Sequence, residues 1–382
     1  MVSFFLSIIS LLAVYSSISS LAYKADGNSF KFLFKHLLML VFGLIAMYTV
    51  HRMQFRYLSR IAQVMIWVAG IMLLFTLVFG VNINDAKRWI NIPFVNMTFQ
   101  TSDFAKIVLI IFVARMLNTN RTFLHDFRKG VLPILVPIAI ICGLILPADF
   151  STAALLFMVC FVLLAVGGVP LRHMMKIVGA GVATLLLVLL IGKASPGMFT
   201  RLDTWISRVE NFTDNEASGN YQIDLAQVAI YQGGLLPTGP GSGSSRNYLP
   251  HPYSDMIYAF IIEEYGAIFG GLGVLMLYMI FMYRSVRIAN RCPKHFGGLV
   301  AMGLATLLTL QALINMAVAV NLIPTTGQPL PLVSMGGTSI IFTCISIGII
   351  LAVSRSVYNE EEWAKENALD PSNKSNGNYV AA

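Results

Sequence analysis

Residues 131–169 read VLPILVPIAIICGLILPADFSTAALLFMVCFVLLAVGGV, and Asp149 is the one charged residue among them. A helix needs about 20 consecutive apolar residues to cross the hydrocarbon core of a bilayer. This sequence supplies two such stretches, 131–147 and 149–169, divided by the hinge Pro147–Ala148–Asp149. It therefore predicts two adjacent membrane-spanning helices joined by a short turn.

The composition of the whole chain indicates the same class of protein. Of the 382 residues, 57% are hydrophobic and only 12% are charged, whereas a soluble domain carries about 25% charged residues. Mean hydropathy is +0.73. These values exclude a soluble enzyme, a disordered chain and a nucleic-acid-binding module, and they predict an integral membrane protein.

Ten apolar stretches are candidates for membrane spans. The short stretch 104–118 and the narrow hinge at Pro147 leave counts of nine or eleven open. Because the alternating pattern of a membrane barrel is absent, the predicted fold class is all-α, a polytopic membrane protein of about ten transmembrane helices. The stretches are 3–23, 32–50, 61–80, 104–118, 131–147, 149–169, 175–193, 256–283, 297–322 and 330–354.

The distribution of basic residues predicts the orientation. Lys and Arg concentrate in cytoplasmic loops. With the N-terminus inside, the inside loops carry 13 Lys and Arg residues and the short outside loops carry 6. We therefore expect both termini to be cytoplasmic. The net charge of +8 then reflects topology and requires no nucleic-acid partner.

One long outside segment, about 194–255, separates the seventh and eighth stretches. Within it, apolar residues recur at helical spacing over residues 199–212, with charged residues between them, which predicts an amphipathic helix in the outer interface. The polar residues after Arg355 predict a disordered cytoplasmic tail at 356–382. We expect residues 1–355 to form a single transmembrane domain.

Ionisable residues in or near apolar spans are costly and are therefore candidates for function. Asp255 lies where the long outside segment meets the eighth stretch. Two interpretations stay open and are compatible with each other: a helix N-cap carboxylate, and a general base at the membrane–water boundary. Two turns further along the same helix lie Glu263 and Glu264. At most one of them shares the side of the helix that holds Asp255, so we expect the other to pair with a basic group or to cap a loop.

A second group of charges lies before and at the start of the fourth stretch. The spacing of Asp103 and Lys106 allows an i,i+3 ion pair. Together with Lys87, Arg88 and Trp89, Lys106 forms a cationic cluster suited to an anionic lipid head group such as a pyrophosphate. Asp149 could cap the sixth stretch or contribute to a cavity, and Arg201 is either an interface anchor or a phosphate ligand.

Two further patterns carry weaker signals. The segment Gly239–Arg246 is Gly-rich but lacks the Lys and Thr or Ser of a nucleotide-binding loop, so a hinge is the favoured interpretation. The six histidines are scattered singly and the four cysteines show no ligand spacing. We therefore predict no metal cluster and no disulfide.

The run Asn321–Ser339, NLIPTTGQPLPLVSMGGTS, is distinctive. It resembles the signature of the SEDS family (shape, elongation, division and sporulation), whose usual form is close to P-x-T-G-x-x-x-P-x-x-S-Y-G-G-S-S. Further segments resemble family motifs in the same order along nearly the whole chain: Lys87–Ile90, Gln100–Lys106, Tyr221–Gln222 with Gly233–Gly234 and Gly239–Gly241, and Leu249–Gly266. The division-type branch, FtsW, is more similar than the elongation-type branch, RodA.

Several positions depart from the family pattern. Thr101 stands in place of a proline, Asp103 in place of a glutamate, and Met335 in place of a tyrosine. Lys35–His36 stands where an Arg–Gln pair is common, and residues 146–152 match their motif only loosely. None of these departures removes Asp255.

The resemblance implies a peptidoglycan glycosyltransferase of cell division in the bacterial inner membrane. Its substrate would be lipid II, a disaccharide-pentapeptide on undecaprenyl pyrophosphate. Its partners would be a class B penicillin-binding protein that supplies transpeptidase activity, and other membrane proteins of the division machinery. The matched positions Asp103, Gln222, Glu263 and Ser334 are assigned to substrate binding.

The predicted mechanism combines the residues with the resemblance. Asp255 would take the proton from the acceptor's 4-hydroxyl, while Lys106, Arg88 and Arg201 would stabilise the departing pyrophosphate. No cofactor is required by the sequence, and a divalent cation, Mg²⁺ or Mn²⁺, could assist. Three alternatives stay open: a RodA-type elongation polymerase, a lipid II flippase or other carrier, and a non-catalytic scaffold.

Overall fold

The structure is a computed structural model. It describes residues 1–17, 29–54, 56–83, 86–92, 97–194, 204–208, 212, 221–245 and 253–369.

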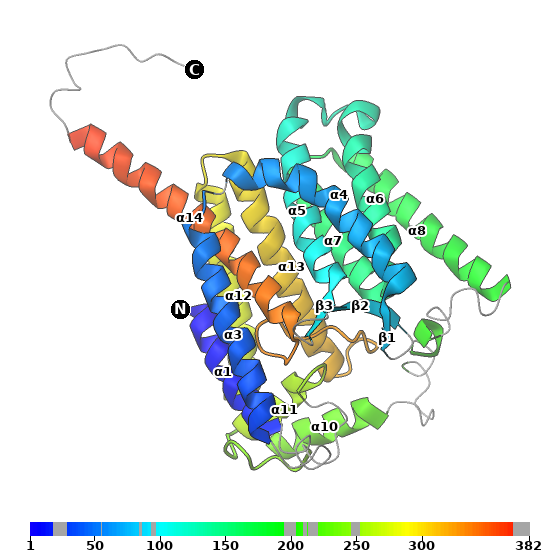
Figure 1. Ribbon diagram of the computed structural model, residues 1–382, viewed down its shortest axis with the longest axis vertical. Helices are drawn as coiled ribbons and strands as arrows, with labels where there is room; N and C mark the ends of the chain where they lie inside the picture. Colours follow the sequence, from blue (N-terminus) through cyan, green and yellow to red (C-terminus); the bar gives the residue numbers. More distant parts are fainter. Residues whose placement is uncertain are drawn as a thin grey trace.

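Helices make up most of the described chain (Figure 1). Each of the ten predicted stretches contains a helix, and six helical segments in the described ranges are long and apolar enough to cross a membrane. The chain is therefore a multi-pass membrane protein. The helices are α1 (Val2–Ser17), α3 (Ser29–Arg52), α4 (Arg56–Phe79), α5 (Thr101–Thr119), α6 (Leu132–Ile145), α7 (Phe150–Val166), α8 (Leu171–Ala194), α10 (Tyr221–Gly233), α11 (Ile257–Tyr265), α12 (Gly273–Arg291), α13 (His295–Ala319) and α14 (Thr338–Leu369).

Two predicted spans are not the continuous α-helices that we expected. The stretch 256–283 is broken into α11 and α12 by a π-helical turn, Gly266–Leu272. Gly266 has φ +73°, and a Cβ there would lie 2.6 Å from the carbonyl carbon of Leu236, so only glycine fits. The stretch 330–354 becomes helical only at Thr338. Pro329 and Pro331 remove backbone donors, and Leu332 adopts φ +67°, so the preceding residues form turns instead.

Two elements were not predicted. Residues between α4 and α5 form a three-stranded antiparallel sheet of β1 (Val81–Ile83), β2 (Ala86–Ile92) and β3 (Met97–Gln100). The pair Trp89–Gln100 in β2 and β3 fixes the register next to the start of α5. The long outside segment contains α10, and of the predicted interfacial helix the structure describes residues 204–208, which are helical, and Phe212.

Two apolar clusters form the core. One joins α4, α5, α6, α7 and α8, and the other joins α1, α3, α10, α11 and α12. Helices α13 and α14 contribute to both clusters, and α13 lies between them (Figure 1). The outward side of α4 is apolar, with Trp67 and Ile71 largely exposed, as expected where a helix contacts lipid.

Several of the predicted inside and outside segments lie at different ends of the bundle. In Figure 1, α10 lies at the lower end and the small sheet lies below α5 and α7, whereas the turn between α5 and α6 and the end of α14 lie toward the upper end. Helix α14 continues to Leu369, so the described part of the predicted disordered tail is helical; residues 370–382 lie outside the described residues. The division at residue 355 stays a prediction.

Candidate active site

A polar cavity of about 290 Å³ lies where the sheet, α5, the α6–α7 turn and the segment 327–339 meet. Five charged residues line it: Arg88, Asp103, Lys106, Asp149 and Asp255. Four of them, all except Asp149, belong to the site predicted from the sequence. In a chain with 12% charged residues, this concentration of charge within the bundle marks the candidate active site. The other lining residues include Trp89, Gln100, Ser254, Gly327, Gln328 and Met335.

Asp255 is positioned by the main chain around it. Asn315 Nδ2 in α13 donates to the Asp255 carbonyl oxygen at 2.8 Å, and Ser334 Oγ donates to the Ser254 carbonyl oxygen at 2.8 Å. The Met335 amide donates to the Tyr253 carbonyl oxygen at 2.9 Å. The signature segment and α13 therefore hold the two residues before Asp255 and Asp255 itself.

The carboxylate of Asp255 does not cap α11. The N-cap residue of that helix is Met256, and no side-chain hydrogen bond caps it. Asp255 Oδ1 instead accepts a hydrogen bond from Ser254 Oγ at 2.8 Å. The N-cap interpretation is therefore wrong, and the carboxylate faces the cavity that it lines.

The signature segment is tied to the rest of the cavity wall through Gln328. Its Nε2 donates to Thr152 Oγ1 in α7 at 2.8 Å, and its carbonyl oxygen accepts from Asn315 Nδ2 at 2.8 Å. Sequence reasoning missed Asn315, although an amide inside an apolar stretch is itself a signal.

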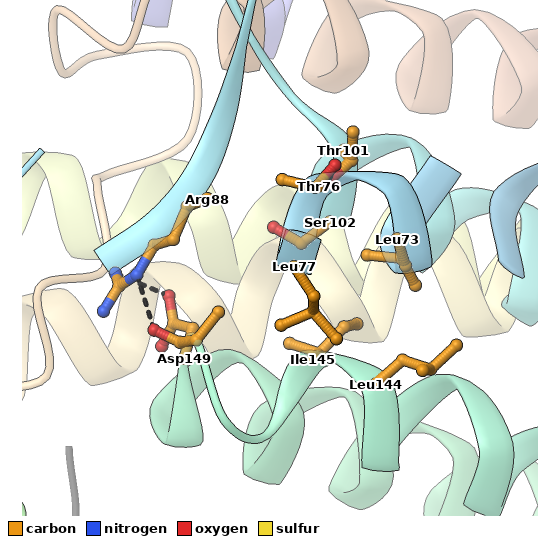
Figure 2. A pocket seen from close by; sticks show the side chains of 10 residues that line it. Leu73, Thr76, Leu77, Arg88, Thr101, Ser102, Leu144, Ile145 and Asp149 are labelled. Carbon is orange, nitrogen blue, oxygen red and sulfur yellow. Dashed lines mark hydrogen bonds and ion pairs between the residues drawn. The ribbon is translucent and has the colours of Figure 1, made fainter. Parts of the chain in front are cut away.

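Arg88 reaches from β2 to the start of α7. Figure 2 shows its guanidinium beside Asp149, where the Nη1–Oδ2 distance is 2.8 Å. Arg88 Nε also donates to the Ala148 carbonyl oxygen at 2.8 Å. Asp149 Oδ1 accepts from the Thr152 amide at 3.0 Å and so caps α7. Asp149 thus does both things that the sequence allowed: it caps the helix and lines the cavity.

The predicted ion pair of α5 is present. Lys106 Nζ lies 2.7 Å from Asp103 Oδ1, and both side chains are buried. Asp103 Oδ2 is buried without a hydrogen-bond partner among the described residues. Each described basic residue of the larger cavity, Arg88 and Lys106, therefore has one carboxylate partner.

A smaller cavity of about 60 Å³ lies on the other side of Asp255. It shares Asp255, Gly327 and Gln328 with the larger cavity and adds Arg208 and Gln222. Arg208 Nη1 donates to the Thr325 carbonyl oxygen at 3.0 Å, and next to it Trp205 packs on Phe150 with ring centroids 4.4 Å apart. The predicted site residue Gln222 thus borders Asp255 from α10.

Arg208 is a site residue that sequence reasoning missed. Burial, and after it the positive charge of Arg88, lower the pKa of Arg208, while the carboxylates of Asp149 and Asp255 act in the opposite direction. Arg208 therefore lies close enough to Arg88, Asp149 and Asp255 to interact with their charges. The sequence had favoured Arg201 on the same predicted helix; Arg201 lies outside the described residues.

Two other predicted site residues line neither of these cavities. Ser334 is buried, donates to the Ser254 carbonyl and accepts from the Leu330 amide at 2.8 Å, so it shapes the signature segment. Glu263 is also buried, and its Oε1 accepts from the amides of Ser244 at 2.8 Å and Ser245 at 3.0 Å.

The Gly-rich segment is held by both glutamates of α11. Glu264 Oε1 accepts from the Gly241 amide at 2.8 Å and also from Ser16 Oγ of α1. In a nucleotide-binding loop the backbone amides bind a phosphate, but here the amides of Gly241, Ser244 and Ser245 donate to the two glutamate carboxylates. The sequence predicts that one glutamate pairs with a basic group or caps a loop. Both glutamates instead accept hydrogen bonds from this loop, so the segment is anchored and is not a hinge.

Comparison with known proteins identifies the family of this chain. The family model described as "Cell cycle protein", covering FtsW, RodA and SpoVE, matches residues 1–359. The chain belongs to this family. It is 31% identical over 351 residues to the probable peptidoglycan glycosyltransferase FtsW of Hydrogenovibrio crunogenus, covering 90% of this chain and 87% of that protein. It is 30% identical over 354 residues to stage V sporulation protein E of Bacillus subtilis, covering 91% and 93%.

Solved structures share the fold. A chain from a study of polymerization and crosslinking by a peptidoglycan synthase complex superposes with a TM-score of 0.74 at 25% identity, over 93% of this chain and 97% of that chain. Rod shape determining protein RodA of Thermus thermophilus superposes with a TM-score of 0.63 at 22% identity, over 93% and 96%. The SEDS resemblance in the sequence is thus confirmed.

Proposed function

We propose that this chain is a peptidoglycan glycosyltransferase that polymerises lipid II into glycan strands during bacterial cell division. The observation that carries the proposal is the position of Asp255, a carboxylate between two polar cavities that together contain Arg88, Lys106 and Arg208. The relatives named FtsW support the same activity.

The chemistry needs one base and several cations. The acceptor hydroxyl gives its proton to Asp255, and its oxygen bonds to the anomeric carbon of the donor sugar. The bond from that carbon to the lipid pyrophosphate breaks, and the electron pair leaves with the pyrophosphate. Arg88 and Lys106 stabilise the negative charge that grows there. Because pyrophosphate is already a good leaving group, no second carboxylic acid is needed, unlike in glycosidases.

The paired acids of the cavity fit this use. Asp149 and Asp103 hold Arg88 and Lys106 in place before substrate arrives, so less ordering is required on binding. Asp103 Oδ2 and the Asp255 carboxylate are oxygen donors of the kind that Mg²⁺ and Mn²⁺ prefer. Within the described residues no group of three or more metal-binding side chains occurs. The proposed reaction requires no bound cofactor, and a divalent cation, Mg²⁺ or Mn²⁺, could assist it.

We further propose the setting of this enzyme. It lies in the cytoplasmic membrane with both termini cytoplasmic and the cavity on the outer face, and it works with a class B penicillin-binding protein and other division proteins. The basic residues of the predicted inside loops and the synthase complex among the solved structures support these points.

Purified protein in detergent with lipid II tests the proposal. A detergent micelle does not separate two compartments, so a flippase forms no product there, whereas a polymerase forms glycan that a gel resolves. Reactions run with a metal chelator, and with added Mg²⁺ or Mn²⁺, show whether a divalent cation assists. A mock purification from the same host controls for other polymerases. Glycan above that control is the expected result; its absence with and without a class B partner contradicts the proposal.

A further inference from the structure

The signature segment Asn321–Ser339 is not helical before Thr338, so its backbone carbonyl oxygens need hydrogen-bond donors from other elements. Side chains of α13, α12 and α1 supply such donors. Gln311 Nε2 donates to the Pro329 carbonyl oxygen at 3.0 Å, Tyr278 Oη donates to that of Pro331, and Ser10 Oγ donates to that of Val333 at 2.9 Å. Helices outside the two cavities therefore fix the backbone of this segment.

The hydroxyl of Ser10 is held by a second side chain. Ser10 and His36 of α3 are both buried, and His36 Nε2 lies 2.9 Å from Ser10 Oγ. A hydroxyl has one proton, and that of Ser10 goes to Val333, so Nε2 is the donor in the bond between His36 and Ser10. His36 Nδ1 is buried without a hydrogen-bond partner among the described residues, which fits a neutral ring with its proton on Nε2. The bonds therefore run from His36 to Ser10 to Val333.

Without His36, the Ser10 hydroxyl has another acceptor. Serine hydroxyls inside helices commonly donate to a carbonyl oxygen one turn earlier in the same helix. Ser7 of α1 does so, because its Oγ donates to the Ser3 carbonyl oxygen at 2.8 Å. For Ser10 the corresponding acceptor is the Leu6 carbonyl oxygen. The bond from His36 thus selects the orientation in which the Ser10 hydroxyl reaches across to the signature segment.

Val333 is closely linked to Asp255. The next residue, Ser334, donates from Oγ to the Ser254 carbonyl oxygen at 2.8 Å. Ser254 directly precedes Asp255, and its own hydroxyl donates to the Asp255 carboxylate at 2.8 Å. A shift of the Val333 carbonyl therefore reaches Asp255 through a short chain of covalent and hydrogen bonds.

We infer that His36 is a positioning residue for the proposed base. By holding Ser10 Oγ on the Val333 carbonyl oxygen, it fixes the segment that carries Ser334 and thereby the carboxylate of Asp255. The inference rests on the proposed function, since it assigns His36 a role in the reaction of Asp255. His36 and Ser10 line neither cavity. Loss of their contact therefore slows the reaction and leaves the binding of lipid II unchanged.

His36→Leu tests this role, because it removes the donor and keeps a side chain of similar volume. With purified protein and lipid II, we expect kcat to fall about tenfold, the effect of one lost hydrogen bond, with KM unchanged. Ser10→Ala should lower kcat to the same extent and covers the case in which His36→Leu does not fold. His36→Gln should restore kcat, because its amide NH₂ reaches the position of the histidine Nε2.

A double variant separates positioning from a general loss of packing. Because His36 acts through Ser10, His36→Leu combined with Ser10→Ala should be no slower than Ser10→Ala alone. Ser7→Ala is the matched control. Ser7 is also buried in α1, but its hydroxyl bonds within that helix and it lines neither cavity. This variant should keep the wild-type kcat.

Amide hydrogen exchange gives a second readout that needs no lipid II. The amides of residues 330–336 are held by hydrogen bonds that depend on the position of this segment. Their exchange should be faster in His36→Leu and Ser10→Ala than in wild type, His36→Gln and Ser7→Ala.

Three results would overturn the positioning role: unchanged kcat or unchanged exchange in both folded single variants, a loss that His36→Gln does not restore, or losses that multiply in the double variant. If the wild type forms no glycan, the proposed function fails. Faster exchange in His36→Leu would then still show that His36 holds the signature segment.

Discussion

Hydrogen bonds to the backbone carbonyl oxygens of Ser254 and Asp255 hold Asp255 in position. Within the described residues, no basic group lies within ion-pair distance of its carboxylate. The acids beside it, Asp103 and Asp149, are each bound to a cation. This difference leaves Asp255 as the carboxylate available for proton transfer. The motif resemblance predicted Asp255, Arg88 and Lys106 as partners, because each lies in a recognisable segment. Arg208 and Asn315 could not be placed, because only the folded chain brings them beside Asp255.

Gly327 gives a prediction at this scale. Its φ is +68°, and a Cβ there would lie 3.7 Å from Asp255 Oδ2, at the junction of the two cavities. Gly327→Ala should cost about 1 kcal/mol of stability through its left-handed backbone. It should also lower kcat about tenfold or more, because the added methyl group takes up space beside the carboxylate that the reacting hydroxyl needs, and small misplacements of reacting groups are costly. Thermal unfolding and polymerisation rates check both effects.

Gly168→Ala is the control for backbone strain. Gly168 has φ +87° and nothing within 4 Å of a Cβ, so the variant carries a similar stability cost away from the cavity. An equal loss of activity in both variants would show that strain alone, and not proximity to Asp255, sets the rate.

At the scale of elements, α10, the Gly-rich segment and α11 form one unit. Gly233 at the end of α10 packs directly on the backbone of α11, where a Cβ would lie 2.3 Å from the Ile262 carbonyl oxygen. Ser244 Oγ donates to Gln232 Oε1 at 2.8 Å, and Glu263 holds the following amide. Gln222 lies in α10, and α11 begins two residues after Asp255. The unit therefore fixes the positions of both residues at the site.

Glu263→Gln should therefore destabilise the protein by about 2 kcal/mol. The glutamine oxygen can still accept from the Ser244 and Ser245 amides, and the Ser245 hydroxyl can turn to accept from the new NH₂, but the negative charge that strengthens these bonds is lost. Thermal or denaturant unfolding in detergent measures this, with exposed Asp224→Asn of α10 as the neutral comparison. A Glu263→Gln variant as stable as Asp224→Asn would mean that the loop is not held by this carboxylate.

Some elements were predictable and others were not. Long apolar stretches identify the membrane helices, because the bilayer fixes their length. The short strands β1 to β3 and helix α10 escaped prediction, because they lie outside the spans and lack that constraint. The break at Gly266 was hidden for a different reason: nothing in an apolar sequence shows that the backbone of Leu236 approaches there.

At the scale of the whole molecule, the site lies where the two apolar clusters meet. The larger cavity takes residues from α5 on one side and from the segments 253–255 and 327–339 on the other, with α13 and α14 shared by both clusters. The pairing of helices could not be read from the sequence, because lipid-facing and protein-facing apolar residues are alike in composition. The polar cavity, by contrast, was partly predictable, because charged residues in or near apolar spans are few and costly and therefore indicate a site.

The central claim is that Asp255 is the base of a lipid II polymerase. Asp255→Asn keeps the size and the Ser254 contact but removes the proton acceptor, while Asp224→Asn makes the same change at an exposed position that lines neither cavity. With purified lipid II, we predict a loss of glycan synthesis of at least about a hundredfold in Asp255→Asn, wild-type synthesis in Asp224→Asn, and unfolding temperatures alike in all three proteins. Wild-type amounts of glycan from folded Asp255→Asn would contradict the account.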